Sequence, residues 1–277
     1  MNLNTSIDRY AVFGNPIGQS RSPDIHTAFA EQTGQSLTYT RQLVDLGKFR
    51  QTADEFFASG GKGLNVTAPF KGDAFEYAQQ LTERAKVAGA VNMLALQQDG
   101  TVLGDNTDGI GMVLDMTQRL GWSLKDKTIL LLGAGGAVRG VLLPCLEEKP
   151  RALTIANRTV AKAEELARRF SAFGAVEACG FDELDERQFD LVINGTSASL
   201  SGELPSIAAS VFAPGAAVYD MMYAAELTPF LDWARAQGVN QLADGLGMLV
   251  GQAAESFYLW RGIRPALEPV LESLRHP

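Results

Sequence analysis

The chain has 277 residues, of which 46% are hydrophobic and 20% charged, and its net charge is −8 at pH 7. This length suits two domains, and the acidic balance argues against a nucleic-acid-binding surface and fits a soluble metabolic protein. We find no signal peptide and no apolar run long enough to span a membrane. The two cysteines and two histidines do not have the spacing of metal ligands, so we expect a cytoplasmic protein without a metal.

Predicted strands and helices alternate along the chain. Strands are expected at residues 10–13, 64–67, 90–94, 128–132, 153–156, 191–194 and 217–220, and helices at 23–33, 48–58, 109–119, 137–147, 160–170, 228–237 and 248–260. Such alternation requires crossover connections and therefore predicts an α/β fold with mostly parallel sheets. No internal repeat or long flexible linker interrupts the pattern.

Polar residues cluster where the predicted strand at 64–67 ends. Alternation places Asn65 and Thr67 on one face of this strand. Pro69 stops the strand, so Lys71 follows at the start of a helix. Rigid strand ends often carry site residues. A solvated edge strand with a surface lysine is the alternative, and this segment alone does not decide between them.

A glycine-rich turn in the second half is typical of a dinucleotide site. The apolar run at 128–132 is followed at once by Gly133, Ala134, Gly135, Gly136 and Ala137, and then by a helix. Glycines there let the backbone approach a pyrophosphate at the helix N-terminus. Val138 stands where the usual third glycine would be, and Pro144 is expected to bend or shorten the helix.

The end of the next predicted strand indicates which cofactor binds. Asn157, Arg158 and Thr159 follow it, where an NAD site usually has an acidic residue. The acid is absent, and Arg158 suits a 2′-phosphate, with Lys162 as a second cation. These residues favour NADP over NAD, although both cations could be ordinary charges on a helix surface.

In the order of its motifs the chain resembles shikimate dehydrogenase over nearly its whole length. The motifs are Gly14-Asn15-Pro16-Ile17 with Ser20-Arg21-Ser22-Pro23, Asn65-Val66-Thr67-Ala68-Pro69-Phe70-Lys71, Gly89-Ala90-Val91-Asn92, Gly104-Asp105-Asn106-Thr107-Asp108-Gly109, the 133–137 turn, Asn157-Arg158-Thr159, Asn194-Gly195-Thr196-Ser197, Asp220-Met221-Met222-Tyr223 and the stretch 244–254. The resemblance implies reversible, NADPH-dependent reduction of 3-dehydroshikimate to shikimate. Met93 and Ser199 depart from the family pattern, which often has threonine and glycine there.

The resemblance also implies roles for individual residues. Ser20, Ser22 and Tyr223 would hold the substrate carboxylate. The ring hydroxyls would be held by Asn92, Asp108, Thr67 and Gln252, with Asn65 nearby. Lys71 and Asp108 would form the catalytic pair, and Glu83, Met221 and Gly245 would lie at the nicotinamide end of the cofactor.

The chemistry of these residues agrees with that implication. A small ring with one carboxylate and three hydroxyls needs many short polar side chains, because a site built to bond a hydroxyl rejects analogues that lack it. The nicotinamide supplies the hydride chemistry. As an ammonium beside Asp108, Lys71 would donate a proton to the oxygen that becomes an alkoxide, so oxidation of shikimate should quicken as pH rises. Lys71 could instead only orient the substrate.

Local sequence offers structural alternatives for some of these residues. Asp108 could cap the helix that begins near residue 109, and Ser20 and Ser22 could cap the helix at Pro23. His26 on that helix is expected to serve packing or the surface rather than catalysis.

The predicted architecture has a discontinuous substrate domain, residues 1–107 and 245–277, and a Rossmann-like NADP-binding domain, 108–244. Substrate is expected in a cleft between them that closes on binding. The protein is expected to be a monomer or homodimer that binds a small molecule and neither nucleic acid nor membrane. A quinate/shikimate dehydrogenase using NAD or both cofactors is the nearer alternative, and a non-catalytic sensor of shikimate-type ligands the more distant one.

Overall fold

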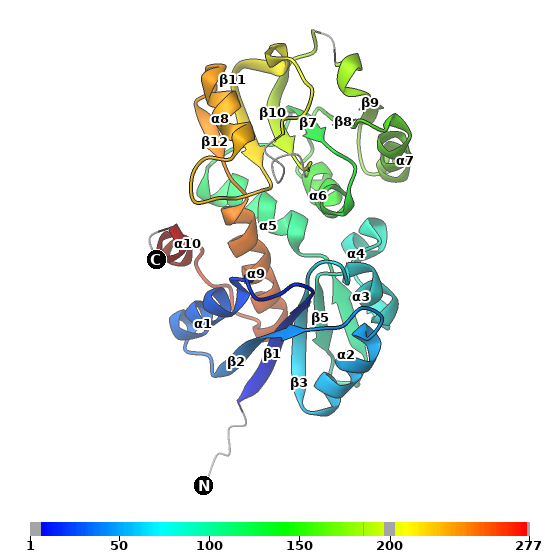
Figure 1. Ribbon diagram of the computed structural model, residues 1–277, viewed down its shortest axis with the longest axis vertical. Helices are drawn as coiled ribbons and strands as arrows, with labels where there is room; N and C mark the ends of the chain where they lie inside the picture. Colours follow the sequence, from blue (N-terminus) through cyan, green and yellow to red (C-terminus); the bar gives the residue numbers. More distant parts are fainter. Residues whose placement is uncertain (1–6, 185, 197–202, 276–277) are drawn as a thin grey trace. The chain divides into compact units, whose positions relative to one another are not determined.

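The computed structural model describes residues 7–184, 186–196 and 203–275 (Figure 1). The chain divides into two compact units, Met1–Gly111 with Val250–Pro277, and Met112–Leu249. The boundaries fall within two helices, α5 (Asp108–Leu114) and α9 (Leu246–Arg261). Lys71, Asp108 and Gln252 therefore all belong to the first unit. No helix in the described part of the chain is long and apolar enough to cross a membrane.

The first unit contains a mixed six-stranded sheet in the order β2-β1-β3-β5-β6-β4. Its strands are β1 (Asp8–Gly14), β2 (Leu37–Leu43), β3 (Gly61–Val66), β4 (Gln80–Leu81), β5 (Met93–Leu96) and β6 (Val102–Asp105). β1 pairs in parallel with β2 and β3, and β4 with β6, whereas β5 runs antiparallel to both β3 and β6. β3 thus lies inside the sheet, which rules out the edge-strand alternative for this segment.

Side-chain alternation gives the two faces of this sheet different characters. On one face, Phe13, Leu64 and Val66 pack with aromatic residues of α2 (Phe49–Ala58) and α3 (Lys71–Tyr77). Burying each such large side chain stabilises the fold by about 1.5–3 kcal/mol. On the other face, Tyr10 packs with Tyr39 and with Trp260 of α9. Asn65 also lies on this second face, because it hydrogen-bonds Tyr39.

The remaining helices of the first unit are α1 (Ser22–Thr33), α4 (Glu83–Ala88) and α10 (Glu268–Arg275). α1 begins with a proline in its first turn and ends at Gly34 in the left-handed conformation, as favoured at helix C-termini. α4 is capped by Thr82, whose hydroxyl accepts from the Ala85 amide.

The second unit contains an all-parallel six-stranded sheet in the order β12-β11-β10-β7-β8-β9. Its strands are β7 (Thr128–Leu132), β8 (Ala152–Ala156), β9 (Val176–Cys179), β10 (Phe189–Asn194), β11 (Phe212–Asp220) and β12 (Gln241–Ala243). Counted from β7, this is the 3-2-1-4-5-6 order of dinucleotide-binding folds. The strand order reverses between β7 and β10, where such folds bind their ligand.

Helices α6 (Gly136–Glu147), α7 (Val160–Phe170) and α8 (Pro229–Ala236) pack around this second sheet (Figure 1). Phe230 and Leu231 of α8 join Leu130, Leu132 and Val218 in a buried cluster. Pro144 does not shorten α6, which continues three residues beyond it.

The predicted α/β fold with mostly parallel sheets is confirmed, but five strands were not predicted: β2, β4, β6, β9 and β12. Four of them have only two to four residues, too few to show a period. β2 is longer, but it lies at a sheet edge and only Tyr39 among its residues is buried. The predicted helix at 109–119 is α5 followed by a π-helical segment, Asp115–Arg119.

Candidate active site

Lys71 and Asp108 form a direct ion pair. Lys71 is the first residue of α3, after β3 and the cis peptide bond that precedes Pro69, and Asp108 is the first residue of α5. Lys71 Nζ lies 2.5 Å from Asp108 Oδ2, and the side chains are 31% and 12% exposed. The pair is therefore shielded but open enough for a ligand to reach the lysine.

Asn92 holds the other oxygen of Asp108. Its Nδ2 donates to Asp108 Oδ1 at 2.8 Å and to Thr107 Oγ1 at 3.0 Å, with a longer contact of 3.4 Å to Gln252 Oε1. The Thr107 amide donates to Asn92 Oδ1 at 2.8 Å, which fixes the amide orientation. Asn92 thus orients the carboxylate so that Oδ2 faces Lys71.

Asn65 is buried beside this group. Its Nδ2 donates to the Asn92 carbonyl at 3.3 Å and to Ser256 Oγ at 3.0 Å, and its Oδ1 accepts from the Tyr39 hydroxyl at 2.7 Å. Burial raises the pKa of Tyr39 well above its ordinary value, so this hydroxyl keeps its proton and acts as a donor. The two N–H groups of Asn65 are both engaged within the protein.

Ser20 and Ser22 lie at the start of α1, with their hydroxyl oxygens 3.2 Å apart. Ser20 Oγ also accepts from the Ser22 amide at 3.3 Å, and neither serine is the N-cap, which is Arg21. Asp108 is likewise the first helical residue rather than a cap. Thr67 follows β3, and its amide donates to the Phe13 carbonyl.

Two glycines bring α5 and α9 together within the first unit. A Cβ at Gly111 would lie 2.3 Å from the Gln252 amide nitrogen, and one at Gly251 would lie 2.4 Å from the Gly111 carbonyl oxygen. Only glycines permit such close backbone contact. This crossing places Gln252 next to Asn92, although the two are far apart in sequence.

Tyr39, Thr107 and Ser256 belong to the same hydrogen-bonded group but were not identified as site residues from the sequence. Thr107 stands next to Asp108 in the motif at 104–109, so its place in that motif was a signal for it. Ser256 lies four residues after Gln252, which puts both on one side of α9. Tyr39 lies on an unpredicted strand, so nothing in the sequence pointed to it.

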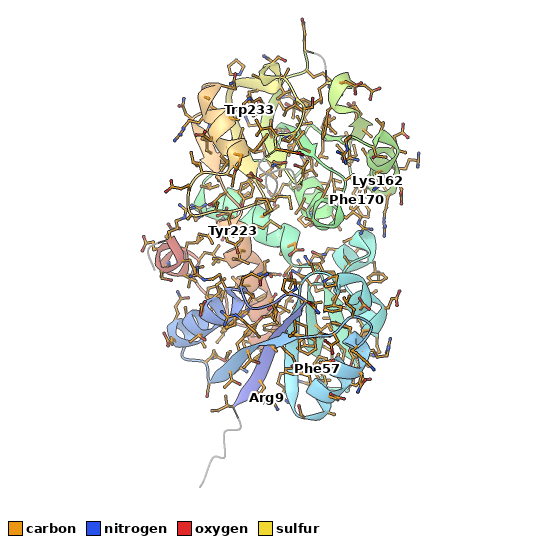
Figure 2. The ribbon with its side chains drawn as sticks, in the orientation of Figure 1. Arg9, Phe57, Lys162, Phe170, Tyr223 and Trp233 are labelled. Carbon is orange, nitrogen blue, oxygen red and sulfur yellow. The ribbon has the colours of Figure 1, made fainter. Side chains whose placement is uncertain are left out.

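A cavity of about 720 Å³ lies in the second unit, at the reversal of strand order. It is lined by the glycine-rich turn, Gly133 to Ala137, by Asn157, Arg158, Thr159 and Lys162, and by residues after β10 such as Gly195, Thr196 and Ser206. Lys162 is on α7 (Figure 2). The cavity is thus lined by glycine backbone and two cations, a combination suited to phosphates, together with one carboxylate, Glu203.

The turn itself fits a dinucleotide. Gly133 has φ +104°, which side chains rarely tolerate. A Cβ at Gly135 would meet no atom within 4 Å, so there is open space beside the N-terminus of α6, where amides lack helical partners. Val138, at the position of the missing third glycine, is buried, and a Cβ at Gly195 would lie 2.5 Å from its Cγ2. The absence of a side chain at Gly195 therefore leaves the space that the Val138 side chain occupies.

The remaining predicted site residues lie as follows. The Met221 amide donates to the Asn194 carbonyl at 2.9 Å, and that of Gly245 to the Met222 carbonyl at 2.9 Å. Tyr223, labelled in Figure 2, belongs to the second unit and is 44% exposed. Glu83 is in the first turn of α4, where its carboxylate is 3.8 Å from Lys86 Nζ. Met93 is buried in β5, and Ser199 lies outside the described residues.

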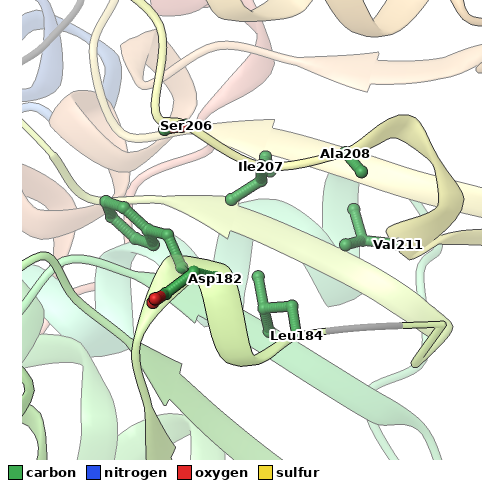
Figure 3. Close-up of a pocket in the computed structure, with 7 residues that line it drawn as sticks. Asp182, Leu184, Ser206, Ile207, Ala208 and Val211 are labelled. Carbon is green, nitrogen blue, oxygen red and sulfur yellow. The ribbon is translucent and has the colours of Figure 1, made fainter.

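A second cavity, of about 450 Å³, adjoins the first through Phe181 and Ser206. Figure 3 shows Leu184, Ile207 and Val211 around a common space. Its lining is mainly aliphatic, with Asp182 as its charged residue. Across the described ranges, no group of three or more His, Cys, Asp or Glu residues could hold a metal ion.

Comparison with known proteins identifies the family. Three family models match: "Shikimate dehydrogenase substrate binding domain" over residues 12–94, "Shikimate / quinate 5-dehydrogenase" over 115–201, and "Shikimate 5'-dehydrogenase C-terminal domain" over 245–275. A curated relative from Cellvibrio japonicus, shikimate dehydrogenase (NADP(+)), is 64% identical over 97% of each chain.

Solved structures agree. An Ael1 enzyme from Pseudomonas putida is 46% identical, with a TM-score of 0.93 over 98% of this chain and 99% of that one. A shikimate 5-dehydrogenase from Thermus thermophilus, solved with NADP(H) and shikimate, is 30% identical, with a TM-score of 0.85 over 97% and 99%. With one relative 64% identical over nearly its full length, and the three family models together spanning most of the sequence, the chain belongs to the shikimate dehydrogenase family.

Proposed function

We propose that this protein catalyses the reversible, NADPH-dependent reduction of 3-dehydroshikimate to shikimate in aromatic amino-acid biosynthesis. The observation that carries this proposal is the 2.5 Å contact between Lys71 Nζ and Asp108 Oδ2 within a group of buried amides and hydroxyls. A proton-transferring group beside short polar side chains suits a small polyhydroxylated ring. Family membership supports the same reaction, because the curated relatives carry this name with NADP(+).

We assign to Lys71 the transfer of the proton to and from the substrate oxygen. In the direction of reduction, its ammonium donates to the substrate oxygen as that oxygen gains negative charge, and Asp108 stabilises the ammonium beforehand. In the direction of oxidation, Lys71 must first be neutral to accept the hydroxyl proton. Asn92 contributes by holding Asp108 Oδ1, so that Oδ2 remains directed at Lys71.

The other polar residues of the first unit bind substrate in this proposal. Ser20 and Ser22 hold the carboxylate near the start of α1, where backbone amides also favour an anion. Thr67, Asn65 and Gln252 hold ring hydroxyls. Tyr223 is proposed to join the serines at the carboxylate, although it belongs to the second unit.

The cofactor is assigned to the 720 Å³ cavity. The amides of the 133–137 turn would hold the pyrophosphate, and Arg158 and Lys162 the 2′-phosphate, with Asn157 and Thr159 beside them. Met221, Gly245 and Glu83 are proposed for the nicotinamide end. When bound, NADP(H) supplies or accepts the hydride.

We further propose that the protein works in the cytoplasm, as a monomer or a homodimer. Cys145 and Cys179 are both buried free thiols, and burial raises the pKa of Cys145 to about 12. Unreactive thiols of this kind suit a reducing compartment.

The test is reduction of NADP⁺ or NAD⁺ by the purified protein, followed by absorbance, with shikimate and with quinate. Rapid turnover confined to shikimate with NADP⁺ is expected. Comparable use of quinate or NAD⁺ would move the protein to the broader quinate/shikimate type. Folded protein without turnover in any pair would contradict the proposed function and favour a ligand sensor.

A further inference from the structure

Ser256 stands at the centre of the polar group around Asn65 and Asn92. It lies on α9, is fully buried, and its Oγ contacts three groups: Asn65 Nδ2 at 3.0 Å, Thr107 Oγ1 at 3.2 Å and the Gln252 carbonyl oxygen at 2.9 Å. All four residues belong to the first unit. Ser256 is not among the residues that we propose to contact the substrate.

The direction of each hydrogen bond at Ser256 follows from the chemistry of its partners. A serine hydroxyl has one proton and two lone pairs. The Gln252 carbonyl can only accept and is the shorter contact of the two that could take the proton, so Ser256 donates there. The Asn65 amide group can only donate, because its orientation is fixed by its bond to the Asn92 carbonyl. Thr107 must then donate to the remaining lone pair of Ser256.

These directions extend to the catalytic pair. With its proton on Ser256, Thr107 Oγ1 accepts from Asn92 Nδ2 at 3.0 Å rather than donating to Asn92 Oδ1. Both N–H groups of Asn92 are thereby assigned, one to Thr107 and one to Asp108 Oδ1. Both N–H groups of Asn65 are also assigned, to the Asn92 carbonyl and to Ser256.

We propose that Ser256 is a positioning residue that completes the hydrogen bonding of Asn65 and Thr107 and so holds the substrate-binding group in its oriented form. Ser256 and the Asn92 carbonyl engage both N–H groups of Asn65, and Tyr39 donates to one lone pair of its Oδ1. Asn65 therefore offers a ligand the remaining Oδ1 lone pair and accepts from a substrate hydroxyl. Through Thr107 and Asn92, Ser256 also holds Asp108 in place beside Lys71. This role rests on the proposed reaction of the same site.

The experiment compares the wild type with Ser256→Ala, using shikimate oxidation with NADP⁺. Loss of the hydroxyl leaves one Asn65 N–H and the Thr107 hydroxyl without this partner. We expect kcat/KM for shikimate to fall roughly tenfold, equivalent to about 1.4 kcal/mol. This fall in kcat/KM should come mainly from a rise in KM for shikimate. The dissociation constant of NADP⁺, measured by calorimetry, should stay within twofold, because the cofactor cavity is lined by residues of the second unit.

Ser273→Ala is the matched control. Ser273 is also a helical serine of the first unit, but its hydroxyl donates to the Val270 carbonyl of its own helix, outside this group. Ser256→Thr, which keeps the hydroxyl, should restore most of the loss. If Ser256→Ala lowers the melting temperature as Ser273→Ala does but leaves kcat/KM within twofold of wild type, the proposal is overturned.

A double-mutant cycle with Asn65→Ala tests the route. If Ser256 acts through Asn65, its substitution should cost less than about threefold once Asn65 is alanine, because contacting residues are not additive. Fully additive losses would overturn the proposal. Should Ser256→Ala fail to fold, the kinetics of Ser256→Thr and Ser256→Cys decide the question. Both variants keep a side-chain donor, but the thiol forms weaker hydrogen bonds than the hydroxyl. Equal kcat/KM in the two variants would overturn the proposal. A wild type that does not turn over would refute the function itself and not this assignment alone.

Discussion

His26 should make the stability of the folded protein fall steeply in mild acid. It lies on α1, fully buried, stacked on Tyr39 with ring centroids 4.2 Å apart and close to Phe29, Phe257 and Trp260. Neither ring nitrogen has a hydrogen-bond partner within the described part of the chain. Burial lowers the pKa of His26 from 6.5 to about 3, and the nearby Asn65 side chain acts in the opposite direction.

The sign and size of the effect follow from this pKa. Between pH 6.5 and 3 the unfolded chain binds a proton on this imidazole and the folded protein does not, so acid favours unfolding. The contribution of His26 is fully present above about pH 6.5 and declines by roughly 1.4 kcal/mol for each pH unit below it. Between pH 7 and 4.5 the free energy of unfolding should lose about 2.5 kcal/mol from this residue alone.

The assay is urea unfolding at a series of pH values for the wild type and for His26→Phe. Phenylalanine keeps an aromatic ring in the same box but cannot be protonated. Other titrating groups, including His276, contribute equally to both proteins and cancel in the difference. The variant should therefore lose about 2.5 kcal/mol less than the wild type between pH 7 and 4.5.

Parallel stability curves for the two proteins over this pH range would refute the reasoning. They would mean that His26 is protonated in the folded state, or that water reaches the ring. A change of slope confined to the region above pH 6.5 would also contradict it, because the unfolded imidazole is then already neutral.

Three further predictions concern the site. Lys71→Ala should lower kcat for shikimate oxidation at least about 100-fold, whereas unchanged kcat with a raised KM, measured by the same absorbance assay, would make Lys71 an orienting group. Arg158→Ala should raise KM for NADP⁺ about tenfold or more and leave that for NAD⁺ nearly unchanged; equal losses with both cofactors would argue against a 2′-phosphate contact. Gly195→Ala places a Cβ 2.5 Å from Val138 Cγ2 and should cost about 1–3 kcal/mol of stability in urea unfolding. Adding Val138→Ala should partly restore that stability, and a double variant no more stable than Gly195→Ala would contradict the steric explanation.

Much of the fold could be predicted because the signals are local. The run at residues 129–132 is wholly apolar and is followed by glycines, so a buried strand leading into a helix was predictable without any partner. β2 could not be predicted in this way, since its place is decided by pairing with β1 and only Tyr39 is buried there. Short strands such as β4 and β12 exist only because a neighbouring strand supplies their hydrogen bonds.

By itself, the sequence determined the α/β class, the glycine turn with its cations, and the motif residues Lys71, Asn92 and Asp108, because residue type and spacing carry that information. Only the tertiary structure decided how these residues meet. The crossing of α5 and α9 at Gly111 and Gly251 brings Ser256 to Thr107 and Asn65, across separations of 149 and 191 residues. A hydrogen bond depends on distance and direction in space, and sequence spacing fixes neither once the chain has folded back on itself.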